Sequence, residues 1–184
     1  MSVNRGKDFE KIIKESFEKV PNTSVVRLHD QTNGFSGSTN PCDFLIYHAP
    51  HLYALECKSV HGNTLPFSNI TKFQWQSLLN MSQVDGVFAG VMCWWIDKDI
   101  TKYIPIQLLD AEKRATDAKS IRYDYDYAYF DKQTFKSSPP VIIQGKKKRV
   151  FFEYDMEKFF KIMEIEYKRK HINDIPERTG VWRE

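Results

Sequence analysis

The chain has 184 residues, of which 41% are hydrophobic and 28% charged, and its formal net charge is +3 at pH 7. This composition is that of a globular domain with its own core, and it excludes a largely disordered chain. No apolar run reaches about 18 residues, which excludes a membrane-spanning helix. The first residues lack the apolar core of a signal peptide, so we expect a cytoplasmic protein. The small positive charge permits an anionic partner without requiring one.

The spacing of cysteines and histidines excludes several kinds of site. The three cysteines, Cys42, Cys57 and Cys93, stand far apart, and their odd number argues against a disulfide framework. They show no CxxC pair, as a structural zinc site would require. The five histidines have no metal-ligand spacing either, and no phosphate-binding loop of a nucleotide-driven enzyme is present.

The N-terminal part of the chain predicts one helix and three strands. A helix is expected over residues 7–19, because its apolar residues recur at helical spacing. A strand over residues 24–28 is followed by a polar, glycine-containing loop over residues 30–41, and a loop of this length is often functional. Strands over residues 42–47 and 52–59 are separated by a short turn, which predicts a hairpin.

The next segment predicts a helix and a buried strand. The helix is expected over residues 70–83, with Ser68 or Asn69 as its N-terminal cap. Residues 87–96 are almost continuously apolar, which is typical of a strand buried on both faces. This order of elements indicates a layered α/β or α+β domain around a central mixed sheet.

The remaining sequence is harder to read. Four tyrosines alternate with smaller residues, which permits a strand with the tyrosines on one face. A basic stretch between two apolar triplets predicts a hairpin with a basic turn. The elements expected are a strand over residues 101–106, a helix over 107–115, the tyrosine strand over 123–129, a hairpin of residues 141–143 and 150–152, and a helix over 155–170.

Three residues of the central hairpin attract attention as a site. Strand alternation puts Glu56 and Lys58 on one face, opposite Leu55 and Cys57. Alone, this pair most often means a surface ion pair on a hairpin. Asp43, however, enters the neighbouring strand and can lie beside Glu56, and two adjacent carboxylates repel each other unless a cation neutralises them. Mg²⁺ is a cation that proteins bind through one or two carboxylates.

This arrangement resembles the PD-(D/E)xK nuclease superfamily. The match is Pro41-Cys42-Asp43, twelve intervening residues, and then Glu56-Cys57-Lys58. Three further segments make the chain similar to the RecU-type Holliday junction resolvases over about residues 4–106. These segments are Asn4-Arg5-Gly6-Lys7-Asp8-Phe9-Glu10, Thr64-Leu65-Pro66-Phe67-Ser68-Asn69-Ile70, and Gln74 in the next helix.

The resemblance implies a restriction-endonuclease-like α/β core, a central mixed β-sheet flanked by helices. It implies a bacterial or phage homodimer that uses Mg²⁺ or Mn²⁺ and no nucleotide cofactor to nick four-way DNA junctions in pairs, in recombination and repair. Asp43 and Glu56 would be metal ligands, Cys57 a ligand through its backbone carbonyl, and Lys58 the catalytic lysine. The domain would span residues 1–184, with a core over about 4–106, a C-terminal elaboration over about 107–170 and a mobile tail over 171–184.

Bacterial members carry a long insertion before the aspartate that engages the junction, whereas residues 30–40 form only a short loop here. Two alternatives to junction resolution therefore stay open. One is a nuclease of the same superfamily that cuts other branched or duplex DNA. The other is a non-catalytic DNA-binding protein with the same fold.

Two further residues are candidates for the catalytic site. Glu10 lies at the edge of the apolar stripe of the first helix, where it is either a solvated flank residue or a third acid that reaches the metal. Gln74 shares a helix face with apolar residues, so it needs a hydrogen-bond partner if it is buried. It would bind a metal-linked water or orient Lys58, or it simply borders the core.

DNA contacts are expected from basic residues and from one aromatic residue. The first helix also offers N-terminal amides to a phosphate. Phe35 in the polar loop would wedge against a base at a branch point, unless it only packs within the loop. Basic turns are often no more than solvated hairpin tips. The basic and polar candidates are Asn4, Arg5, Lys7, Arg27, Lys72, Lys146, Lys147, Lys148 and Arg149.

Overall fold

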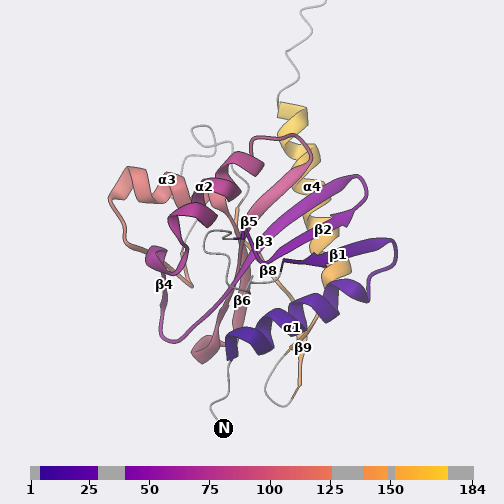
Figure 1. Cartoon of the computed structure of the whole chain (residues 1–184), viewed down its shortest axis with the longest axis horizontal. Coiled ribbons are helices and arrows are strands. Elements are labelled where there is room, and N and C mark those ends of the chain that lie inside the picture. The colour runs from indigo at the N-terminus through magenta and orange to yellow at the C-terminus, as the bar shows by residue number, and fades with distance from the viewer. Residues whose placement is uncertain (1–4, 29–39, 126–138, 149–151, 174–184) are drawn as a thin grey trace, which may run out of the picture.

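The structure is a computed structural model, and it describes residues 5–28, 40–125, 139–148 and 152–173 (Figure 1). Asn4, Phe35 and Arg149 lie outside these ranges, as do residues 126–129 of the expected tyrosine strand and most of the expected tail. The helices are α1 (Arg5–Glu18), α2 (Lys72–Met81), α3 (Ile106–Thr116) and α4 (Met156–Asn173), and short 3-10 turns cover Phe67–Asn69 and Ile96–Lys98. None of the described helices is long and apolar enough to cross a membrane.

Six strands form the central sheet, in the order β1-β2-β3-β5-β6-β8. β3 and β5 run parallel and every other neighbouring pair is antiparallel, so the sheet is mixed. This confirms the predicted α/β fold class, with helices on the faces of a mixed sheet. The six strands are β1 (Thr23–Arg27), β2 (Phe44–His48), β3 (His51–Val60), β5 (Val87–Trp95), β6 (Ile100–Pro105) and β8 (Val141–Ile142).

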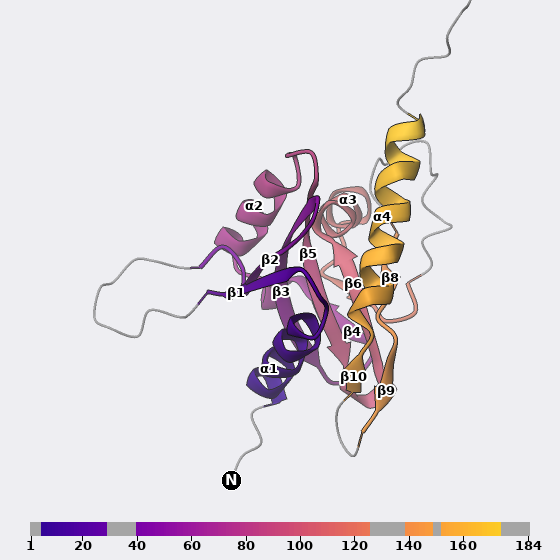
Figure 2. The same cartoon turned by 90° about the vertical axis from the view of Figure 1, so that its right-hand side faces the viewer.

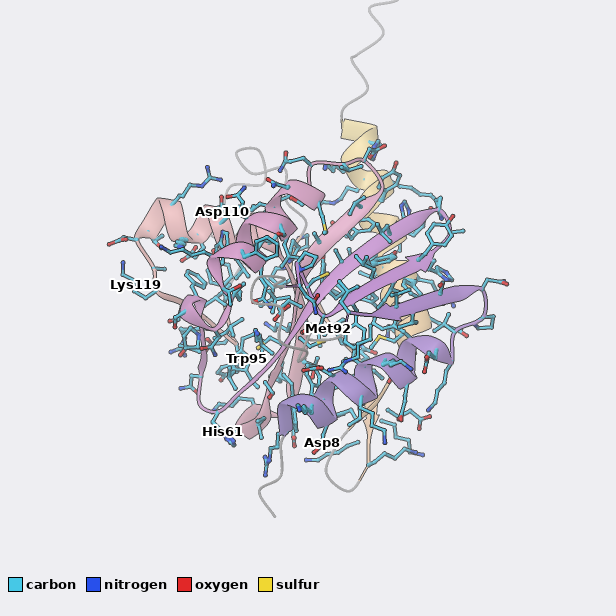
Figure 3. All side chains as sticks on the ribbon, viewed as in Figure 1. Asp8, His61, Met92, Trp95, Asp110 and Lys119 are labelled. Atoms are coloured by element: carbon cyan, nitrogen blue, oxygen red, sulfur yellow. The ribbon has the colours of Figure 1, made fainter. Side chains whose placement is uncertain are left out.

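The sheet separates two apolar clusters, and β5 contributes to both, as its continuous apolar sequence predicts. Met92 and Trp94 pack into the cluster that also contains residues of α1 and α4. Cys93 and Trp95 face the other way, into the cluster with α2 and α3. Figure 1 shows α2 and α3 together and α1 crossing below the strands, and Figure 3 marks Met92 and Trp95 on β5.

A close approach between β5 and β6 requires a glycine. A Cβ atom added to Gly90 would lie 2.4 Å from the carbonyl oxygen of Ile104 and 2.7 Å from Cε2 of Tyr103. Tyr103 is almost fully buried, so it has little room to move. The absence of a side chain at residue 90 therefore lets the two strands pair with the Tyr103 ring packed against them.

Two short sheets change the predicted C-terminal layout. β4 (Thr64–Pro66) pairs with β7 (Ser120–Arg122), so the strand ends just before Tyr123, where a turn begins, and the predicted strand start was wrong. β9 (Gly145–Lys147) pairs with β10 (Phe152–Tyr154). Figure 2 shows this hairpin leading into α4.

The predicted pairing of residues 141–143 with 150–152 was also wrong, because β8 extends the central sheet beside β6 and buries Val141 in the core. Lys146 and Lys147 consequently belong to a strand and not to a turn. α4 continues three residues beyond its predicted end. Its last turns contact the loop before β5, where the Tyr167 hydroxyl donates to Asp85 over 3.1 Å.

Candidate functional site

The register of the β2–β3 hairpin brings Asp43 beside the segment of β3 that carries Glu56, as predicted. The last pair of the ladder is Phe44 with Leu55, and the Asp43 amide continues it by donating to the Leu55 carbonyl over 3.1 Å. The Asp43 side chain then reaches along β3, where its Oδ2 accepts the backbone N–H of Cys57 at 2.7 Å. Asp43 therefore lies beside residues 55–57 of β3, just before the first paired residue of β2.

The same geometry places the Cys57 carbonyl beside Asp43. In an extended strand the N–H and C=O of one residue point to the same side. Since the Cys57 N–H faces Asp43, its carbonyl oxygen lies on that side too. The Cys57 side chain points into the apolar cluster with α1 and α4, which confirms the prediction that it is a core residue. The role of its carbonyl as a metal ligand stays a prediction.

Glu56 lies on the face toward α2 and is almost completely buried, with 1% of its surface exposed. Its Oε1 atom has two donors: Lys58 Nζ at 2.6 Å and Gln74 Nε2 at 2.8 Å. Its Oε2 atom is buried and has no hydrogen-bond partner among the residues that the structure describes. A buried carboxylate oxygen without a partner is unfavourable, so this atom is the place where a ligand of opposite charge would gain most.

Both carboxyl groups hold their protons to higher pH than usual. Burial raises the pKa of Asp43 to about 6, although the Cys57 N–H bond opposes this, and the charge of Glu10 adds to it. Burial raises the pKa of Glu56 to about 7, and the neighbouring charge of Asp43 adds to the rise. Burial alone would lower the pKa of Lys58, but the charge of Glu56 and its hydrogen bond raise it above its usual range. Lys58 is therefore a firmly protonated ammonium group.

Glu10 extends from α1 toward the same site, but its nearest partner is a cation of β1. It forms an ion pair with Arg27, and both charges act on Asp43. In the described part of the chain, no three side chains of His, Cys, Asp or Glu lie close enough to hold a metal ion. The site as folded thus offers two carboxylates and a backbone carbonyl, and Glu10 as a third ligand stays a prediction.

The residues present fit a hard divalent cation. Two carboxylates and a carbonyl are oxygen ligands of the kind that Mg²⁺ and Mn²⁺ take, with water filling the other positions. A divalent cation would give the partnerless Oε2 of Glu56 a partner and would favour the charged form of both acids, whose pKa values burial raises. The lysine beside them completes a group suited to phosphate chemistry.

The candidate DNA-binding residues that the structure describes lie on several different elements. Lys7 at the start of α1 and Lys72 at the start of α2 are both exposed, near the helices that flank β3. Arg5 begins α1, and Arg27 is engaged with Glu10. In the basic hairpin, Lys147 pairs with Asp99 and Lys148 with Glu153, while Lys146 is exposed on β9. Part of the basic stretch is therefore neutralised within the molecule.

The sequence prediction missed the residue that caps α2. The cap of α2 is Thr71, not Ser68 or Asn69, because residues 67–69 form a separate 3-10 turn. The Thr71 side chain accepts the Gln74 N–H, and the Gln74 side chain accepts the Thr71 N–H. This reciprocal pair is a capping box, and its Thr-x-x-Gln spacing is visible in the sequence.

Comparisons with known proteins do not assign this chain to a family. No protein-family model and no curated protein matches the chain. Among solved structures it is similar to Hjc, a Holliday junction resolvase from the archaeal hyperthermophile Archaeoglobus fulgidus, with 19% sequence identity and a TM-score of 0.47. The similarity covers 64% of this chain and 88% of that chain. A likeness at this level does not establish an activity.

Proposed function

We propose that this chain is a metal-dependent DNA endonuclease of the PD-(D/E)xK superfamily that resolves four-way junctions by paired phosphodiester hydrolysis. The observation that carries the proposal is the convergence of Asp43, Glu56 and Lys58, with one buried oxygen of Glu56 left without a partner. An unneutralised acid pair in a buried position destabilises a fold, so its presence favours a working cation site over a surface ion pair. The fold around it is a restriction-endonuclease-like core in this proposal.

Asp43 and Glu56, with the Cys57 carbonyl, would hold Mg²⁺ or Mn²⁺. When bound, the metal makes its coordinated water more acidic and offsets negative charge on the phosphate. Lys58 would donate to the attacking water or to a phosphate oxygen, since its ammonium group is protonated and held in place by Glu56. Gln74 would orient the Glu56–Lys58 pair, since it donates to the same Oε1 atom that Lys58 contacts. The products would be a 5′-phosphate and a 3′-hydroxyl.

The DNA partner and the assembly belong to the same proposal. A homodimer would place two such sites about a two-fold axis, which matches the symmetry of a four-way junction. Lys7 and Lys72, exposed on the helices beside the site, are the basic residues best placed to meet the phosphates near the cut. The three described cysteines are free and buried, which fits a reducing cytoplasm.

The test is cleavage of a fixed four-way junction beside a linear duplex of the same sequence, with Mg²⁺ or with EDTA. Wild type and Asp43→Asn are compared, and DNA binding is followed in parallel. The proposal expects symmetric, metal-dependent nicks in the junction that the substitution abolishes while binding persists. Equal cutting of the duplex would remove the junction specificity and leave the nuclease. Binding with no cutting in Mg²⁺ or Mn²⁺ would refute the nuclease and indicate a non-catalytic DNA-binding protein.

A further inference from the structure

Hydrogen bonds connect the start of α2 to Glu56 of β3. Thr71 Oγ1 accepts the Gln74 amide at 3.2 Å, and Gln74 Oε1 accepts the Thr71 amide at 3.0 Å. From this box the same Gln74 side chain extends its Nε2 to Glu56 Oε1 over 2.8 Å. A helix cap thus ends in a hydrogen bond to a buried carboxylate of the candidate site.

The capping box determines which end of the Gln74 amide faces Glu56. Because the carbonyl oxygen of Gln74 is occupied by the Thr71 N–H, the NH₂ group must point away from the box, toward Glu56. The reversed amide would place a carbonyl oxygen against a carboxylate and an NH₂ group against an N–H, and both contacts are repulsive. The backbone N–H of residue 71 therefore fixes Gln74 as a hydrogen-bond donor to Glu56. The Thr71 hydroxyl accepts the Gln74 backbone N–H and so holds the first turn of α2 where these groups meet.

This donor decides how Glu56 is presented. Oε1 receives both Gln74 and Lys58, while Oε2 has no partner among the described residues. We propose that Thr71 is a positioning residue of the metal site, which acts through Gln74 to hold Glu56 with Oε1 occupied and Oε2 directed to the cation. The inference rests on the proposed function, because it assumes that a divalent cation binds between Asp43 and Glu56.

The role goes beyond stabilising a helix. An ordinary cap satisfies backbone N–H groups and ends there. Here the Gln74 side chain that closes the box also occupies one of the two Glu56 oxygens. Loss of the Thr71 hydroxyl frees the Gln74 backbone N–H and loosens the first turn of α2, which weakens the hold of the residue 71 N–H on the amide that positions Glu56. Groups that orient a metal ligand typically change metal affinity by about 10- to 100-fold when removed.

The experiment measures Mn²⁺ binding to the full-length protein from the electron paramagnetic resonance signal of free Mn²⁺, which needs no DNA and no turnover. Thr71→Val keeps the shape of the side chain and loses the acceptor, whereas Thr71→Ser keeps the acceptor. The matched control is Asp155→Ala, since the Asp155 side chain accepts the Lys158 N–H at the start of α4, away from Glu56. Circular dichroism confirms that each variant is folded at the temperature of the titration.

We expect Thr71→Val to weaken Mn²⁺ binding about 10-fold, Thr71→Ser to restore it to within twofold of wild type, and Asp155→Ala to leave it unchanged although it also loses a cap. Wild-type affinity in Thr71→Val, or equal weakening in Asp155→Ala, would overturn the positioning role. Asp43→Asn distinguishes a failure of the positioning role from a failure of the metal site. If wild type binds no Mn²⁺, or binds it as tightly as Asp43→Asn does, the metal site itself and the proposed function fail together.

Discussion

Removing one carboxylate from the site is expected to stabilise the metal-free protein. The pKa of Asp43 is raised from its ordinary value of 3.8 to about 6 in the folded chain. The folded state therefore holds its proton to higher pH than the unfolded state, and stability is lost as the pH rises from about 4 to about 6. Asp43→Asn abolishes this loss because the amide carries no charge at any pH in the window.

The size of the effect follows from the shift. About two pH units correspond to about 3 kcal/mol of folding free energy above pH 6. An asparagine can still accept the Cys57 N–H, but it buries an NH₂ group in place of an oxygen, which costs about 1 kcal/mol. The net gain is about 2 kcal/mol, and for a chain of this size it raises Tm by roughly 4–8 °C. Below pH 4 the gain disappears.

The assay is thermal unfolding of both proteins at pH 4 and pH 8 in EDTA, and again at pH 8 with Mg²⁺. Added Mg²⁺ should raise the Tm of wild type and leave that of Asp43→Asn unchanged, because in the proposed site only wild type would hold the cation between two acids. Asp97→Asn is the control, for which the expected change in Tm has the opposite sign. The pKa of Asp97 is lowered by the Gly62 N–H and by His61, so its substitution should lower Tm at pH 8. A lower Tm for Asp43→Asn in EDTA at pH 8 would refute the electrostatic account of the site.

Three other variants test separate features. Lys58→Gln should reduce the rate of DNA cleavage by at least about 100-fold, in single-turnover assays, while leaving Mn²⁺ binding in place, since the lysine acts on the reacting groups and not on the metal. Gly90→Ala should destabilise the fold by about 1–3 kcal/mol in urea unfolding, because its Cβ would overlap the Ile104 carbonyl, and unchanged stability would show that β5 and β6 separate easily. Lys72→Ala should weaken junction binding and reduce its salt slope by about 1 if the residue contacts a phosphate; an unchanged slope would exclude the contact.

The buried acid pair affects the conditions under which the protein should be purified. With no cation bound, a protein with two buried carboxylates near Lys58 is less stable at neutral pH than the same fold with neutral side chains there. Such a stability deficit is a common feature of functional sites. Purification in EDTA at alkaline pH is therefore the condition under which this chain should unfold most readily.

Local patterns in the sequence determined much of the fold and the choice of Asp43, Glu56 and Lys58 as candidate site residues. The helical stripe of α1, the continuous apolar run of β5 and the hairpin of β2 and β3 each follow from a period that the chain carries by itself. The placement of Asp43 beside Glu56 followed as well, because a hairpin with a short turn leaves little choice of register.

Only the tertiary structure decided which partners these residues take. β8 pairs with β6 in the central sheet, and β9 pairs with β10. The packing of Val141 and Tyr154 into the core outweighs the local turn pattern. Gln74 faces Glu56 because α2 packs across β3, a contact between segments 18 residues apart that no periodicity reports. Which oxygen of Glu56 stays open is likewise a property of the assembled site, since it depends on donors from two different elements. Sequence patterns set the elements and their faces, whereas long-range packing sets the hydrogen bonds between them.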